Sequence, residues 1–433
     1  MEKFFCSHPV QGLICYLDLY EAFNFRMVSR FCCRQTKVAV RISVKFSSWD
    51  WAIKLRSIYP NIKLHAFNLT ALTENKDLPL IQSFRHLKNE FFPDEKFFMN
   101  QTKLKAICID SINLKIPHQI FPHLTNLCYL HIDIWNISHE DLDKASLWSL
   151  SNLTTLTLNS STPTGIKSLT WLNLCTNLFE LSLYLPGLKE ISIDRLTKLT
   201  KLQLFRGVNC DCILPNLEKL ALSGHSPVLE THHLMMRRVR TLSVINLTVE
   251  LGRLGNLEHL YVSNCKIALR YLNSMDRLIS LSLCLQKDVD LNSLKALPCL
   301  EKLEITEGGY SDVDIGCLTN IRHLRLVRCH NLSLNCFERM GKLEILDVCE
   351  SIDFLKGDIK NLMGLRGLVI KNLDDSCKEG ILKLTNLTSL NCDGVVFSEG
   401  ELGGLVRLKI FSGKKGRRDD YRKLMEKVRV VLS

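Results

Sequence analysis

The stretch that decides the fold runs from residue 321 to residue 348 and reads IRHLRLVRCHNLSLNCFERMGKLEILDV. It contains the pattern L-x-x-L-x-L twice, with Ile or Val in some positions, as Ile321-x-x-Leu324-x-Leu326 and as Leu343-x-x-Leu346-x-Val348. The last two apolar residues of each pattern are two positions apart, so both point to one face of a short strand while the residues beside them point to the other. The pattern therefore predicts one buried apolar row and one exposed row on each strand.

The same pattern recurs along most of the chain. Its first apolar residue, called the anchor below, stands at positions 104, 127, 153, 178, 199, 217, 239, 257, 278, 300, 321, 343, 365, 387 and 405. The mean interval is about 21.5 residues, inside the range of leucine-rich repeats. Many anchors follow a Leu-x-Asn step, as in Leu124-Thr125-Asn126-Leu127 and Leu384-Thr385-Asn386-Leu387. Over residues 101–411 the chain thus resembles the leucine-rich-repeat family.

That resemblance implies an α/β fold, a curved solenoid of about 15 or more rungs. Each rung would contribute one strand to a parallel sheet and return along the opposite side as an extended, 3₁₀ or short helical segment. Leucine usage agrees with a boundary near residue 100, since residues 1–100 contain ten leucines and residues 101–410 contain sixty-five. We therefore assign residues 101–411 to the solenoid.

The family has an Asn or Cys eight residues after the anchor, whose side chain satisfies backbone groups at the turn. Cys265 and Cys329 match this offset, whereas other residues, such as Gly308, occupy it elsewhere. The departure predicts irregular rungs within an unchanged fold.

The flanks of the repeat region have a different composition. Residues 41–100 contain an alternating stretch that ends at Phe46 and an Ile62-x-Leu64-x-x-Phe67 frame, which predict one or two degenerate rungs. Residues 412–433 carry eight Lys and Arg against three Asp and Glu. An apolar stripe within them predicts a basic helix that caps the last rung.

Residues 1–40 resemble an F-box. The motifs that carry the resemblance are Tyr16-Leu17-Asp18-Leu19 and Arg26-Met27-Val28-Ser29-Arg30. The resemblance implies a small helical head that binds the Skp-type adaptor of a cullin ubiquitin ligase. The contacts it implies are apolar: Pro9, Ile14, Leu17, Leu19 and Val28. The competing interpretation is a plain helical cap, because solenoids shield their end rungs.

The rest of the sequence excludes several classes of function. The net charge of +11 is concentrated at the two ends, so a contiguous basic surface for nucleic acid is not expected. No stretch is apolar enough to span a bilayer, and no export signal stands at the start, so we expect an intracellular, cytoplasmic or nuclear protein. Phosphate-loop, nucleophile-elbow and zinc patterns are absent. We therefore expect no catalytic residue, metal, cofactor or small-molecule substrate.

The candidate binding surface is the concave face of the sheet. Side chains two, four and six residues after each anchor point away from the buried row, and aromatic and charged residues recur among them. Such residues concentrate binding energy at protein interfaces. The candidates are Tyr129, His131, Tyr184, Phe205, Tyr261, His323 and Arg325, with Tyr184 and Phe205 expected to be neighbours on adjacent rungs.

Taken together, the sequence predicts a non-catalytic protein-binding subunit. On the F-box interpretation, it would be the substrate-recognition subunit of a cullin-RING ubiquitin ligase, with an unknown target protein on the concave face. The alternative is a stand-alone interaction scaffold or inhibitor whose N-terminal helices are only a cap.

Overall fold

The computed structural model describes residues 43–46, 63–67, 81–86, 95–111, 120–134, 147–162, 166, 169–205, 208–210, 212–224, 238–246, 248–249, 254–267, 272, 275–285, 291–330, 332–349, 359, 362–371, 377–392, 395–413 and 429–432. The chain divides into two compact units, Met1–Leu214 and Pro215–Ser433. Each unit is described by itself below.

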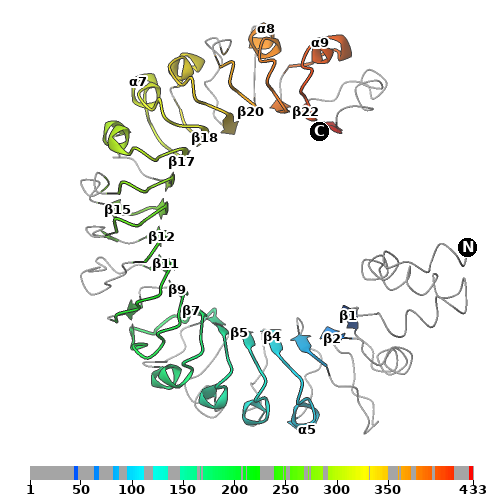
Figure 1. The fold of residues 1–433 in the computed structure, drawn as a ribbon, viewed down its shortest axis with the longest axis vertical. Coiled ribbons are helices and arrows are strands. Elements are labelled where there is room, and N and C mark those ends of the chain that lie inside the picture. Colours follow the sequence, from blue (N-terminus) through cyan, green and yellow to red (C-terminus); the bar gives the residue numbers. More distant parts are fainter. Residues whose placement is uncertain are drawn as a thin grey trace, which may run out of the picture. The chain divides into compact units, whose positions relative to one another are not determined.

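The first unit contains a parallel sheet in which strands pair with their neighbours along the chain (Figure 1). In order these are β1 (Ser43–Phe46), β2 (Lys63–Phe67), β3 (Ser83–His86), β4 (Ala106–Ser111), β5 (Tyr129–Ile134), β6 (Thr155–Ser160), β7 (Glu180–Tyr184) and β9 (Lys201–Phe205). A two-residue pair, β8 (Glu190–Ile191) and β10 (Asn209–Cys210), lies on the return side.

The second unit repeats this arrangement with all of its neighbouring sheet strands parallel. Its strands are β11 (Lys219–Ser223), β12 (Thr241–Ile245), β14 (His259–Ser263), β16 (Ser280–Cys284), β17 (Lys302–Thr306), β18 (His323–Val327), β19 (Ile345–Cys349), β20 (Gly367–Ile370), β21 (Ser389–Cys392), β22 (Ile410–Gly413) and β23 (Arg429–Leu432). A second small pair joins β13 (Thr248–Val249) to β15 (Lys266–Ile267).

The repeat predicts strand positions closely. For the anchors from 104 to 387, a strand starts two residues after the anchor in every case. Burial alternates along the strands as the pattern requires: in β18, Leu324 and Leu326 are buried, and Arg325 between them is exposed. The predicted parallel sheet with an inward apolar row is confirmed.

The prediction at Leu405 is wrong by three residues. β22 starts at Ile410, so Leu408 is the true anchor, and Ile410 is exposed rather than inward. The N–H of Leu408 donates to the carbonyl of Leu405 at 2.9 Å, as that of Leu387 does to Leu384. Because many rungs have a second L-x-x-L step before the anchor, as Leu384-x-x-Leu387 does, Leu405 matched the anchor pattern in the sequence.

The flanks also differ from expectation. Residues 41–100 contribute three strands rather than one or two. The additional strand is β3, in which Phe84 is the buried residue, and no L-x-x-L-x-L pattern marks this strand in the sequence. Phe84 packs against Phe98 with ring centroids 5.4 Å apart. At the other end, Arg429–Leu432 form a strand paired with β22, so the predicted capping helix does not extend over these last residues, and the apolar stripe on which it was predicted lies outside the described part. Residues 1–40 and 414–428 lie outside the described part.

Short helices form much of the return side, as predicted. Figure 1 shows them opposite the strands within each unit. They are α5 (Glu95–Met99), η2 (Phe121–His123), η3 (Leu147–Ser149), η4 (Thr170–Leu174), η6 (Leu291–Ala296), α7 (Asp312–Gly316), η7 (Leu334–Phe337), α8 (Lys378–Leu382) and α9 (Glu399–Gly403).

The Leu-x-Asn steps link one rung to the next. The amides of Asn126, Asn152 and Asn386 donate to backbone carbonyls of the preceding rung, each at 2.8 Å. Asn386 also accepts a hydrogen bond from Arg407 at 2.9 Å. The asparagine of the motif thus satisfies carbonyl groups that the turns leave unpaired.

Two of the predicted turn residues act as the family motif implies. The thiol of Cys265 donates to the carbonyls of Ser263 and Val244 at 3.1 and 3.4 Å. That of Cys329 lies 3.7 Å from the carbonyls of Ile305 and Val327. The residue before each of them, Asn264 and Arg328, has a positive φ, which turns the chain away from the sheet.

Candidate protein-binding face

The sheet face is defined here as the surface formed by side chains two, four and six residues after the anchors. All seven predicted binding residues lie on it. Tyr129 and His131 are on β5, Tyr184 is on β7, Phe205 on β9, Tyr261 on β14, and His323 and Arg325 on β18. The first four belong to the first unit and the last three to the second, so they form two separate groups.

In the first unit, the expected aromatic pair is present. The rings of Tyr184 and Phe205 have centroids 5.9 Å apart and are tilted by 56°. Both side chains are half-buried. On nearby strands, in equivalent positions, stand Asn159 and Asp133, which share a hydrogen bond of 3.4 Å. This group offers a partner two aromatic surfaces beside polar groups, an arrangement typical of protein interfaces.

In the second unit, Arg325 lies at the centre of a polar chain across four strands. Its guanidinium contacts Glu304 at 3.1 Å and Asp347 at 3.3 Å. Glu304 in turn accepts a hydrogen bond from Ser282 at 3.3 Å. The side chain of Arg325 is still 53% exposed. Two carboxylates thus hold Arg325 in place while half of its side chain stays exposed, and an exposed guanidinium can stack on a partner group or form paired hydrogen bonds with it.

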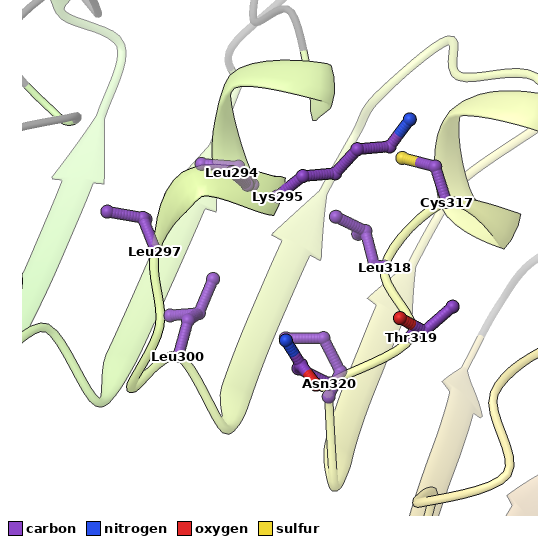
Figure 2. Close-up of a pocket in the computed structure, with 9 residues that line it drawn as sticks. Leu294, Lys295, Leu297, Leu300, Cys317, Leu318, Thr319 and Asn320 are labelled. Atoms are coloured by element: carbon purple, nitrogen blue, oxygen red, sulfur yellow. The ribbon is translucent and has the colours of Figure 1, made fainter.

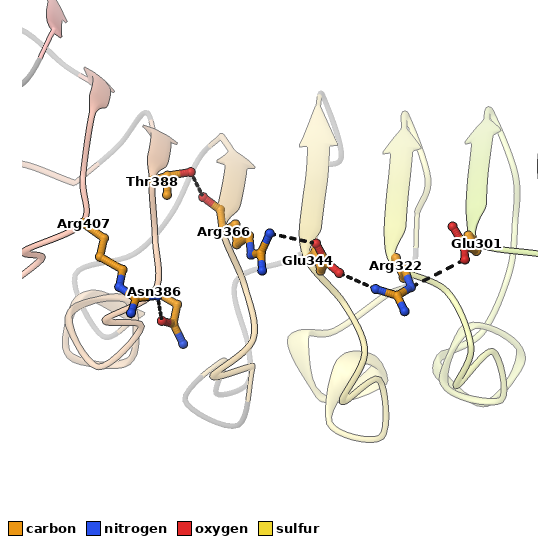
Figure 3. Close-up of polar contacts among 7 residues, drawn as sticks. All are labelled: Glu301, Arg322, Glu344, Arg366, Asn386, Thr388 and Arg407. Carbon is orange, nitrogen blue, oxygen red and sulfur yellow. Dashed lines mark hydrogen bonds and ion pairs between the residues drawn. The ribbon is translucent and has the colours of Figure 1, made fainter.

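A second ladder runs beside the first, one residue before each strand (Figure 3). Arg322 contacts Glu344 at 2.6 Å and Glu301 at 3.7 Å, and Arg366 contacts Glu344 at 3.6 Å. Sequence reasoning missed this ladder. Its signal was present as glutamates at 301, 304 and 307 opposite arginines at 322, 325 and 328, each set spaced by three.

Tyr261 is an exposed aromatic residue of the second unit. Its direct neighbours in register are Ser243 on β12 and Ser282 on β16. Because both are small, the ring of Tyr261 stands above them with 37% of the residue exposed. The exposed part of this side chain is accessible to a partner.

A cavity of about 170 Å³ lies between η6 and residues 317–321 (Figure 2). Four leucines and Ile321 supply the apolar part of its wall, and Lys295 extends toward Cys317. Burial raises the pKa of Cys317, and Asp314 adds to the rise while Lys295 opposes it. Burial likewise raises the pKa of Cys175 to about 11. These thiols stay protonated at neutral pH and are not activated nucleophiles.

The remaining sequence predictions concern adaptor contacts, metal sites and membrane-spanning helices. The implied adaptor contacts Pro9, Ile14, Leu17, Leu19 and Val28 lie outside the described residues. Within the described ranges, no group of three or more His, Cys, Asp or Glu side chains could hold a metal ion. In that same part of the chain, no helix combines the length and apolarity that crossing a bilayer requires.

Comparisons with known proteins point to the fold. No protein-family model matches the chain, and no curated protein matches it. Among solved structures, a TLR13–ssRNA13 complex is similar, with 18% identity over 84% of this chain and a TM-score of 0.57. The Toll–Spätzle complex of Drosophila has 14% identity over 96% of this chain and a TM-score of 0.54. This chain spans 61% of the length of each.

An internalin, InlF from Listeria monocytogenes, is 19% identical over 74% of this chain and 83% of its own, with a TM-score of 0.41. The Toll and TLR13 chains are leucine-rich-repeat proteins, and their similarity concerns the fold. Within each unit of this chain, strands start at a constant distance after their anchors, and neighbouring strands are parallel. Buried and exposed residues alternate along them. The fold is therefore a leucine-rich-repeat solenoid.

Proposed function

We propose that the protein is a protein-interaction scaffold that binds its partner on the sheet face. The observation that carries this proposal is the packed pair of Tyr184 and Phe205, 5.9 Å apart on the exposed side of adjacent repeats. Burying two neighbouring aromatic rings stabilises a complex strongly, since central aromatic residues contribute about 2 kcal/mol or more on truncation. The TLR13 and Toll chains, whose structures are complexes with RNA and with protein, support a binding role for a chain of this fold.

A double variant tests this proposal. Tyr184→Ala with Phe205→Ala should reduce capture of the partner by about tenfold or more, because both rings leave the interface. The measurement is affinity purification of the full chain from its source, followed by quantitative mass spectrometry. Leu174→Ala serves as the matched control, since Leu174 is 51% exposed but lies on η4, off the sheet face.

The expected result is at least one protein enriched by wild type and by the Leu174 control and lost with the double variant. Thermal unfolding of each variant shows whether the fold is intact. If all three proteins capture the same set equally, binding does not use the aromatic pair, and the proposal fails.

A second, finer function concerns residues 1–40. We also propose that this segment is an F-box that binds a Skp-type adaptor, so that the scaffold would recruit targets to a cullin ubiquitin ligase. Its support is the sequence motif formed by Tyr16-Leu17-Asp18-Leu19 and Arg26-Met27-Val28-Ser29-Arg30. Holding a target near the ligase raises the effective concentration of its lysines.

Pull-down with a purified Skp-type adaptor tests the second function. Wild type should bind, and Leu17→Asp with Val28→Asp should weaken binding by about tenfold or more, because buried charges replace apolar contacts. The control replaces two polar residues of the same segment, Gln11→Ala and Asn24→Ala. No binding by wild type would leave the segment as a cap and the scaffold as a stand-alone binder.

A further inference from the structure

The sheet face of the second unit carries a row of lysine and histidine side chains. The residue two after the anchor is aligned by direct register from β11 to β18: Lys219, Thr241, His259, Ser280, Lys302 and His323. Lys, His and Lys alternate with small hydroxyl residues over the first five strands. Lys219, His259 and Lys302 are exposed, and Thr241 and Ser280 are half-buried.

These lysine and histidine side chains are available to a partner. Among the described residues, none of Lys219, His259, Lys302 and His323 forms an ion pair or a side-chain hydrogen bond. Two carboxylates near His259 and Lys302 already form ion pairs with arginines. Glu258 contacts Arg240 at 3.3 Å, and Glu304 contacts Arg325 at 3.1 Å. Lys219 and Lys302 therefore present positive charge without an ion-pair partner among the described residues, beside arginines that are paired with carboxylates.

The distance between successive basic residues of the row favours one backbone conformation of the partner. Neighbouring strands lie about 4.8 Å apart, so Lys219, His259 and Lys302 follow one another at about 9.6 Å. A polyproline II helix rises about 3.1 Å per residue with three residues per turn, so every third side chain lies on one face at about 9.3 Å. In a β-strand, side chains on one face recur at about 6.7 or 13.4 Å, which does not match.

From this match we propose that the second unit binds an acidic, extended segment of a partner protein in polyproline II conformation, with a carboxylate at every third residue. The three carboxylates would pair with Lys219, His259 and Lys302, while Thr241 and Ser280 leave room for the backbone between them. Tyr261, on the same strand as His259 and two residues further on, would pack against an apolar or proline side chain of the segment. The inference rests on the proposed scaffold function and names the chemistry of one partner.

A peptide titration tests the proposal. The main probe is a fluorescein-labelled nonapeptide with glutamate at every third residue, separated by Pro-Ala pairs. A second peptide has the same composition with its three glutamates adjacent, and a third has lysine in place of glutamate. The dissociation constant for the full chain is measured by fluorescence anisotropy at low and at moderate salt.

The spaced glutamate peptide should bind most tightly, and its affinity should fall as salt rises, because exposed charges are screened. Lys219→Glu with Lys302→Glu should weaken its binding by about tenfold or more, since two attractions become repulsions. The control, Arg277→Glu with Arg339→Glu, makes the same change in net charge at exposed residues outside the strands and should leave the affinity unchanged.

Equal affinity for the two glutamate peptides would overturn the proposal, and so would an equal loss of peptide affinity in both double variants. The proposal also fails if a nine-nucleotide single-stranded RNA binds more tightly than the peptide and its binding depends on Lys219 and Lys302. If the proposal fails in one of these ways but the wild-type chain still captures its partner in the affinity purification, the scaffold function remains supported. Loss of capture by the Tyr184 and Phe205 variant together with peptide binding that depends on Lys219 and Lys302 supports both.

Discussion

Replacing Leu324 with alanine should lower the free energy of unfolding by about 3 kcal/mol, whereas replacing its neighbour Arg325 with alanine should lower it by less than about 1 kcal/mol. The two residues are adjacent on β18 but point to opposite faces. Leu324 is 1% exposed within the apolar row. Its truncation leaves a cavity that neighbouring rungs cannot fill without moving.

Arg325 contributes less, although it makes two ion pairs, because its side chain is 53% exposed and solvent screens both contacts. The measurement is urea unfolding of the full chain, followed by circular dichroism. Hydrogen exchange over β17 to β19 adds a local readout, since repeat proteins can open in segments. Equal losses for both variants would contradict the alternation of inward and outward residues on which the sheet face depends.

Replacing Gly308 with asparagine, which the leucine-rich-repeat motif has at this offset, should destabilise the protein. Gly308 stands eight residues after its anchor, where the repeat motif has Asn or Cys. A Cβ atom there would lie 2.1 Å from Cε2 and 2.5 Å from Cδ2 of Tyr310, whose side chain is buried. The Tyr310 ring thus occupies the space of the missing side chain. Gly308→Asn should lower the free energy of unfolding by about 2 kcal/mol through overpacking.

Gly309 is the matched control, because a Cβ there meets nothing within 4 Å. Gly309→Asn should change stability by less than about 0.5 kcal/mol. The double variant Gly308→Asn with Tyr310→Ala should be more stable than the sum of the two single losses predicts, since removing the ring makes room for the amide. A stabilising Gly308→Asn would show that Tyr310 does not fill this space.

Part of the candidate site follows from sequence because strand geometry has a fixed period. The positions of Tyr184 and Phe205 on the exposed side, and their adjacency, were predicted from anchor spacing and confirmed at 5.9 Å. The pairing of Arg325 with Glu304 and Asp347 was not predicted. It depends on side-chain conformations of residues 21 and 22 positions away, which a search for apolar periodicity does not test.

The sequence by itself determined the inward row and the start of each strand from β4 to β21, apart from the two-residue strands of the return side. Every rung must bury the same apolar face against its neighbours, so that requirement recurs in the chain at a readable interval. Only the tertiary structure decided that Leu408 rather than Leu405 is the last anchor, that Phe84 replaces leucine in an early rung, and that Tyr310 fills the space beside Gly308. These outcomes depend on volume and hydrogen bonding between rungs, and one local pattern of apolar residues is compatible with more than one solution.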